Sequence, residues 1–162
     1  PFGFQNFDVD PDVVTMAKGI ASGFPMGACA ARSDVAAAFS PGDHGSTFGG
    51  SNLAVAAALA TLSILVEEGF GAKVKRTGAY FREKLAAIDE VVEVRGLGLM
   101  VGVDLDASWG DAHEAVARGL EAGLVFNATG ASTLRFLPPL ICGERDVDRF
   151  VETLAKILSN RC

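Results

Sequence analysis

Residues 91–105 constrain the fold of this chain most, because apolar and polar side chains alternate there around closely spaced glycines. Gly96, Gly98 and Gly102 interrupt the alternation, and glycine permits the positive φ angles that tight turns need. The pattern predicts two antiparallel strands joined by a tight turn. It does not match a dinucleotide-binding fingerprint, because the third glycine comes one position late and residues 103–105 continue as a strand.

The residues on both sides of this hairpin have apolar side chains at the spacing of amphipathic helices. The predicted helices span residues 72–88, 111–122 and 144–158. Two further short strands are predicted at residues 124–126 and 133–137. Residues 75–162 are therefore expected to form a compact α+β domain with a short antiparallel sheet.

The first 74 residues contain apolar segments, but too few of them to complete a domain. Short strands are predicted at 12–17 and 27–31, and a short helix at 33–39. A longer helix at about 52–68 is apolar nearly all round, so it is expected to be buried on several faces. Because the chain also opens without an initiator methionine, we interpret residues 1–74 as a remnant of a longer protein.

The composition excludes several classes of function. The 162 residues carry a formal net charge of −6, which does not suit a nucleic-acid partner. Cys29, Cys142 and Cys162 have no CxxC spacing, so neither a disulfide framework nor a zinc site is indicated. With only His44 and His113 in the chain, no metal site is expected. Since the sequence shows neither a signal peptide nor an apolar stretch long enough to cross a bilayer, we expect a cytoplasmic protein with no membrane partner.

A single lysine, Lys18, follows an apolar segment and precedes three glycines, Gly19, Gly23 and Gly27. A desolvated lysine loses charge readily, and its amine can then form a Schiff base with an aldehyde. A solvated lysine at the end of a strand is the more common situation. The residue alone leaves both interpretations open.

Ser46 and Thr47 lie in a glycine-rich loop, residues 45–50, directly before a predicted helix. Hydroxyls, exposed backbone N–H groups and a helix N-terminus together suit a phosphate, although an ordinary Ser or Asn helix cap is the more common explanation. Asp43 and His44 stand too close to Ser46 in sequence for the three side chains to align as a hydrolytic triad.

Arg135 stands in an otherwise apolar strand. Its neighbours Leu134 and Phe136 share one face by strict alternation, which leaves Arg135 on the other. A guanidinium in this position needs an anionic partner. That partner is either the carboxylate of a ligand, held bidentately, or an internal Asp or Glu.

Five segments of the chain, taken together and in order, resemble the class III (fold type I) aminotransferases. They are residues 12–19, 23–28, 44–50, 95–100 and 134–140. The sequences of these segments are most similar to those of the acetylornithine aminotransferase subfamily. The resemblance implies the α/β fold of fold type I, with residues 1–74 from the large domain that binds pyridoxal 5′-phosphate (PLP) and residues 75–162 forming the small C-terminal α+β domain.

The resemblance also implies roles for four residues. Lys18 would bind PLP as a Schiff base and afterwards shuttle a proton. Thr47, with Ser46 beside it, would bind the cofactor phosphate across the interface of a homodimer, so that two chains share each active site. Arg135 would bind a substrate carboxylate. The implied reaction transfers an amino group from N-acetylornithine to 2-oxoglutarate, a step of arginine biosynthesis.

Alternatives remain within and outside this function. The chain could belong to an ornithine, 4-aminobutyrate or related omega-amino-acid aminotransferase, or to a glutamate-1-semialdehyde aminomutase. It could also act only as a non-catalytic folding or dimerisation fragment.

The sequence departs from the family pattern at Ser51 and Asn52, where the family has Asn-Pro. The family's Asp-Glu-Val-Gln segment, whose aspartate pairs with the pyridine nitrogen, is expected before the start of this chain. Asp8, Asp10 and Asp12 lie in a different motif and do not replace it.

Overall fold

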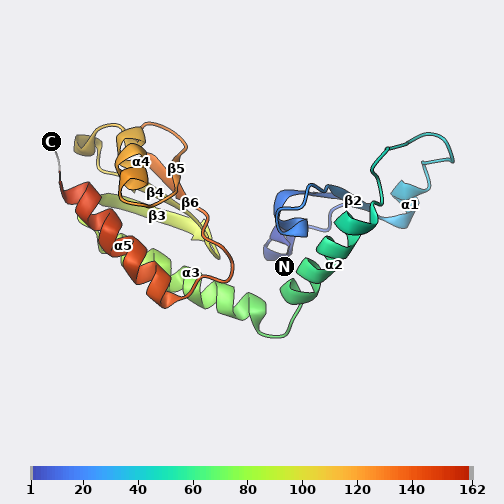
Figure 1. The fold of residues 1–162 in the computed structure, drawn as a ribbon, viewed down its shortest axis with the longest axis horizontal. Coiled ribbons are helices and arrows are strands. Elements are labelled where there is room, and N and C mark those ends of the chain that lie inside the picture. Colours follow the sequence, from blue (N-terminus) through green and yellow to red (C-terminus); the bar gives the residue numbers. More distant parts are fainter. Residues whose placement is uncertain (1, 161–162) are drawn as a thin grey trace. The chain divides into compact units, whose positions relative to one another are not determined.

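The computed structural model describes residues 2–160, which divide into two compact units (Figure 1). The N-terminal unit ends at Gly71 and the C-terminal unit begins at Ala72, three residues before the boundary that the sequence suggested. Each unit has a hydrophobic core of its own.

The N-terminal unit consists of short elements and one longer helix. They are η1 (Gly3–Asn6), β1 (Val13–Met16), η2 (Lys18–Ala21), β2 (Ala28–Ala31), α1 (Ser33–Ala36) and α2 (Asn52–Leu65). The two strands pair antiparallel, with Val13 opposite Ala31 and Met16 opposite Ala28, so the strands predicted here are confirmed. Helix α1 is shorter than predicted, and α2 ends three residues earlier than expected.

Helix α2 is not buried on several faces, and this expectation was wrong. Of its residues only Ala54 and Ala58 are buried, whereas Leu53 and Leu59 are 71% and 63% exposed. The reason is the small size of the N-terminal unit, in which a two-stranded sheet and the η2 turn can cover only one narrow stripe of the helix.

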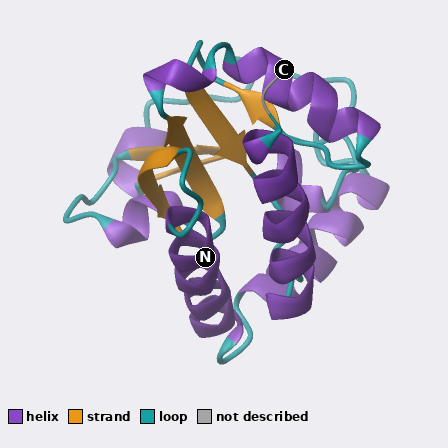
Figure 2. Cartoon of the chain, turned by 90° about the vertical axis from the view of Figure 1, so that its left-hand side faces the viewer, coloured by secondary structure: helices purple, strands orange, loops and turns teal. Residues whose placement is uncertain are grey.

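The C-terminal unit contains three helices and a four-stranded sheet. Its elements are α3 (Phe70–Ala86, which begins just before the division), β3 (Val91–Leu97), β4 (Met100–Leu105), η3 (Ala107–Trp109), α4 (Ala112–Glu121), β5 (Asn127–Ala128), β6 (Thr133–Phe136) and α5 (Glu144–Ser159). The strands are all antiparallel, in the order β3-β4-β6-β5. Figure 2 shows the strands in orange among the helices in purple. The predicted hairpin is confirmed, with Gly98 in the turn at a φ of 56°.

The core of the C-terminal unit lies on one face of this sheet. Buried side chains alternate along the two central strands, namely Val101, Val103 and Leu105 on β4 and Leu134 and Phe136 on β6. Phe81 of α3 and Phe150 of α5 pack against Phe136, with ring centroids 5.8 and 5.1 Å apart. Both helices therefore cover the apolar face, while the opposite face stays open.

The strand predicted at residues 124–126 was wrong, because these residues follow the turn that closes α4 and have no regular secondary structure. Gly123 has a φ of 80°, and the N–H of Leu124 donates to the carbonyl of Gly119 at 2.8 Å, which closes the helix. Val125 is 87% exposed. Strand β5 begins only at Asn127.

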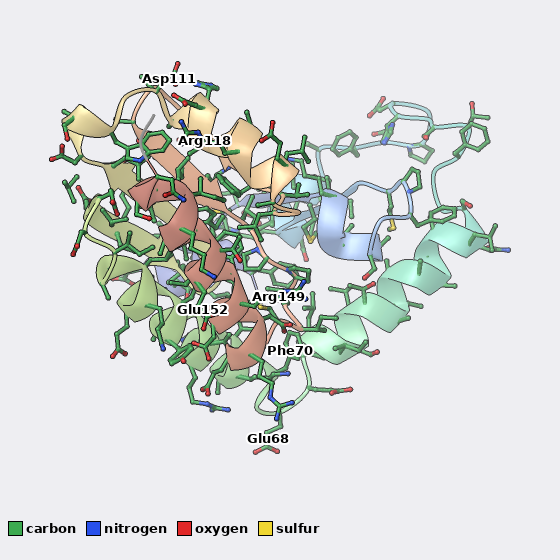
Figure 3. The ribbon with its side chains drawn as sticks, turned by 60° about the vertical axis from the view of Figure 1, so that its left-hand side comes forward. Glu68, Phe70, Asp111, Arg118, Arg149 and Glu152 are labelled. Atoms are coloured by element: carbon green, nitrogen blue, oxygen red, sulfur yellow. The ribbon has the colours of Figure 1, made fainter. Side chains whose placement is uncertain are left out.

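Charged side chains accompany α4 and α5. Figure 3 labels Asp111 at the start of α4, Arg118 on α4, and Arg149 and Glu152 on α5. Asp111 is the N-cap of α4 and accepts a hydrogen bond from the N–H of His113 at 2.9 Å. This capping explains why the helix begins where it does.

Among the described helices, none is by itself long and apolar enough to cross a membrane. Helices α2 and α3 reach the required length and composition only when they are counted together as a broken pair.

Candidate active site

Lys18 is the first residue of the η2 turn, directly after β1. Its φ is 53°, in the left-handed region that costs a side-chain-bearing residue roughly 1–2 kcal/mol. Its side chain is exposed. Such backbone strain is found more often at functional sites than elsewhere, so the conformation favours a functional over a merely solvated lysine.

The turn that carries Lys18 is held on α2. Ile20 and Ala21 are buried in the small core against this helix. The hydroxyls of Ser22 and Thr61 lie 2.9 Å apart, and Thr61 itself donates to the carbonyl of Ala57 at 2.9 Å. Because that bond uses the proton of Thr61, Ser22 is the donor between the two hydroxyls. These contacts hold the backbone directly after the strained residue against α2.

Ser46 and Thr47 are exposed in the loop that leads into α2. The carbonyl of Ser46 accepts from the N–H of Gly49 at 3.3 Å, which forms a turn just before the helix. At the N-cap of α2, Ser51 makes no side-chain capping hydrogen bond. The ordinary cap considered from the sequence is therefore not formed there, and the first N–H groups of α2 stay available to an anion.

Arg135 lies in a row of residues across the open face of the four-stranded sheet. Arg95 pairs with Gly102, Gly102 with Arg135, and Arg135 with Asn127. Residues directly opposite one another in neighbouring strands share a face. Gly102 therefore lies between Arg95 and Arg135, and Asn127 lies on the far side of Arg135.

The two arginines have different partners. Arg95 binds both carboxylate oxygens of Asp104, at 2.9 Å for Nη2 to Oδ1, and this guanidinium, followed by the Thr133 hydroxyl, lowers the pKa of the Asp104 carboxyl. Arg135 donates from Nε to Oδ1 of Asn127 at 3.2 Å, and within residues 2–160 no carboxylate forms an ion pair with it. The internal Asp or Glu considered from the sequence is thus absent, and the charge of Arg135 is uncompensated in the described part of the chain.

The four candidate residues are divided between the units. Lys18, Ser46 and Thr47 belong to the N-terminal unit and Arg135 to the C-terminal unit. Within the described residues, no side-chain hydrogen bond joins Lys18 to Ser46 or Thr47. Sequence reasoning missed Asn127, because it follows a strand placed three residues too early.

The cysteines give no sign of a metal or disulfide site in residues 2–160. Cys29 is exposed and Cys142 is half-buried, and both are free. Burial is the main reason why the pKa of the Cys142 thiol is raised. No group of three His, Cys, Asp or Glu in this range could hold a metal ion, and Cys162 lies outside the described residues.

Comparison with known proteins decides the family. The family model "Aminotransferase class-III" matches residues 1–158. This chain belongs to the class-III aminotransferases. It is 45% identical to the acetylornithine aminotransferase of Caldanaerobacter subterraneus subsp. tengcongensis, over 98% of this chain and 40% of that protein. The chain thus spans about 40% of the length of the curated relatives it matches.

Solved structures agree with the sequence relatives. The N-acetylornithine aminotransferase of Stenotrophomonas maltophilia K279a is 31% identical, with a TM-score of 0.85 over 98% of this chain and 42% of that chain. The ornithine aminotransferase of Toxoplasma gondii ME49 is also 31% identical, with a TM-score of 0.85 over 96% of this chain and 38% of that chain. The two units of this class-III aminotransferase chain therefore form part of a fold type I enzyme.

Class-III aminotransferases depend on PLP, and the residues of the N-terminal unit fit this cofactor. Lys18 supplies an amine that is exposed and therefore accessible to an aldehyde. Two hydroxyls and the uncapped N-terminus of α2 supply donors for a phosphate.

Proposed function

We propose that the longer protein carrying this chain transfers the amino group of N-acetylornithine to 2-oxoglutarate, with PLP as cofactor. The observation that carries the proposal is the strained conformation of Lys18, the residue to which the resemblance assigns the role of Schiff-base lysine. The names of the relatives support the choice of amino donor.

In this proposal each candidate residue has one task. When bound, PLP supplies an aldehyde for the amine and a ring that withdraws electrons from the substrate Cα. The Nζ of Lys18 would take the proton from the substrate Cα as a general base and give it up again as a general acid. Thr47, Ser46 and the N-terminus of α2 hold the phosphate, and Arg135 binds a substrate carboxylate.

We also propose a cytoplasmic homodimer in which Thr47 of one chain serves the site that contains Lys18 of the other. The exposure of the loop around Thr47 supports this arrangement, since an exposed loop is free to reach a neighbouring subunit. The substrates are then an amino acid and a 2-oxo acid, and neither nucleic acid nor membrane is a partner.

Replacement of Lys18 tests the proposal. In the full-length protein, Lys18→Ala removes both the covalent attachment point and the proton carrier, so we expect amino transfer from N-acetylornithine to fall by at least about a thousandfold. The absorbance of lysine-bound cofactor should disappear as well. Lys73→Ala, an exposed lysine of α3, is the matched control and should keep both signals.

Full activity in Lys18→Ala would refute the proposal. The same assay with ornithine and 4-aminobutyrate separates the substrate alternatives, since the true donor gives the highest kcat/KM.

The 162-residue chain, assayed in parallel with the full-length protein, should show no turnover. Lys18 is exposed within the N-terminal unit, and an exposed site does not exclude water. Turnover by this chain alone would overturn the view that it acts only as a folding or dimerising part.

A further inference from the structure

We propose that Asn127 is a positioning residue for Arg135, which it orients for carboxylate binding without compensating its charge. The inference rests on the proposed function, in which Arg135 binds a substrate carboxylate. Asn127 itself touches neither substrate nor cofactor in this proposal. It acts through the guanidinium alone.

The sheet register places the two residues side by side. Strands β5 and β6 pair antiparallel with Asn127 directly opposite Arg135, and Nε of Arg135 donates to Oδ1 of Asn127 at 3.2 Å. A guanidinium has donors only, so the amide of Asn127 must turn its oxygen toward it. On the other side of Arg135 the row continues with Gly102, which has no side chain to hold the guanidinium.

This hydrogen bond selects the edge of Arg135 that remains for a ligand. A guanidinium can bind a carboxylate through Nε and one terminal nitrogen, or through both terminal nitrogens. Because Asn127 occupies Nε, the terminal edge with Nη1 and Nη2 is left for a bidentate carboxylate. Asn127 therefore fixes the direction from which the substrate carboxylate approaches.

Arg95 shows what a charged neighbour would do instead. It lies in the same row, beyond Gly102, but Asp104 binds its terminal nitrogens bidentately. Asp104 therefore compensates the charge of Arg95 and occupies its Nη1 and Nη2 edge. An aspartate at position 127 would give Arg135 the same kind of partner, whereas the neutral amide leaves both its charge and its terminal edge to the ligand.

The test is Asn127→Asp in the full-length protein, because this change keeps the shape of the side chain and alters only its charge. We expect KM for 2-oxoglutarate and for N-acetylornithine to rise about tenfold or more, while kcat changes by less than about threefold. Asn127→Ala, which removes the acceptor without adding charge, should raise KM less than Asn127→Asp.

Two controls accompany these variants. Asn160→Asp makes the same chemical change at the C-cap of α5 and should leave KM unaltered. Arg135→Ala measures the carboxylate site itself. If Arg135→Ala raises KM but Asn127→Asp leaves it within about twofold, the role of Asn127 is overturned. If Arg135→Ala also leaves KM unaltered, the proposed role of Arg135 fails, and the inference fails with it.

A second readout needs no activity. In the 162-residue chain, the side-chain Nε–H of Arg135 can be followed by NMR, since the hydrogen bond to Asn127 is formed within the C-terminal unit. Asn127→Ala should speed the exchange of this proton with water severalfold. An unaltered exchange rate would show that Asn127 does not hold the guanidinium, and would overturn the inference.

Discussion

At the scale of single residues, the backbone conformation around Lys18 is strained, and the sequence pattern does not predict this strain. Lys18 and Ser22 both have positive φ, at 53° and 47°, and neither is glycine. Gly23, directly after Ser22, has a positive φ of 98° as well. The surrounding contacts explain these conformations, because Ile20 and Ala21 are buried against α2 and the chain turns just before and just after them.

The ion pair between Arg95 and Asp104 makes part of the folding free energy depend on pH. The guanidinium lowers the pKa of the Asp104 carboxyl, so its contribution is complete above the unfolded-state pKa of about 3.9 and disappears as the pH falls toward the folded-state value. We expect Asp104→Asn to lower the free energy of unfolding by about 1 kcal/mol near neutral pH. Below about pH 4 this difference from wild type should shrink.

Urea unfolding followed by the fluorescence of Trp109 measures this difference. Trp109 is the one tryptophan of the chain, and it is buried in the C-terminal unit with Nε1 donating to the carbonyl of Leu158 at 2.9 Å. Glu152→Gln on the outer surface of α5 controls for the loss of one negative charge. A difference for Asp104→Asn that stays constant down to pH 2 would contradict the linkage.

At the scale of elements, helix α3 packs unusually closely on the β3–β4 turn. A Cβ atom on Gly78 would lie 2.0 Å from the carbonyl oxygen of Gly98, and Nη1 of Arg82 donates to the same oxygen at 3.0 Å. Because this oxygen belongs to the backbone, it cannot move aside as the end of a flexible side chain could. We expect Gly78→Ala to lower the free energy of unfolding by about 2–4 kcal/mol, measured by the same urea titration.

Gly71→Ala is the matched control for this substitution. It also lies in α3, and nothing stands within 4 Å of a Cβ placed there. Alanine favours helix over glycine by up to about 1 kcal/mol, so this variant should be neutral or more stable. If Gly78→Ala is as stable as the wild type, the close packing of α3 on the β3–β4 turn does not contribute to the free energy of unfolding.

The elements also show which patterns the sequence can predict. The β3–β4 hairpin and α5 follow from local periodicity, and both are confirmed. The burial of α2 and the position of β5 were wrong, because each depends on what packs against the segment. Helix α2 finds few partners in the described residues, and β5 begins only at Asn127, after the turn that closes α4. The open-face position of Arg135 followed from alternation, whereas its bond to Asn127 required the register.

At the scale of the whole molecule, the two units differ in how much core they contain. In the C-terminal unit a continuous cluster of buried side chains joins the sheet to three helices. Among the described residues of the N-terminal unit, the buried cluster consists of Ile20, Ala21 and Ala58, beside a two-stranded sheet. Because two-stranded sheets are marginally stable on their own, the two units should not contribute equally to the stability of the chain.

We therefore expect a polypeptide of residues 70–162 to fold cooperatively by itself, and one of residues 1–71 to stay largely unfolded. Circular dichroism and amide hydrogen exchange measure both outcomes. In the 162-residue chain, Leu154→Ala in the core of α5 should cost about 3 kcal/mol, whereas Leu53→Ala on exposed α2 should cost little. If residues 70–162 fail to fold, or if Leu53→Ala is as costly as Leu154→Ala, the stability of the chain resides in both units and its division into an autonomous and a dependent part is wrong.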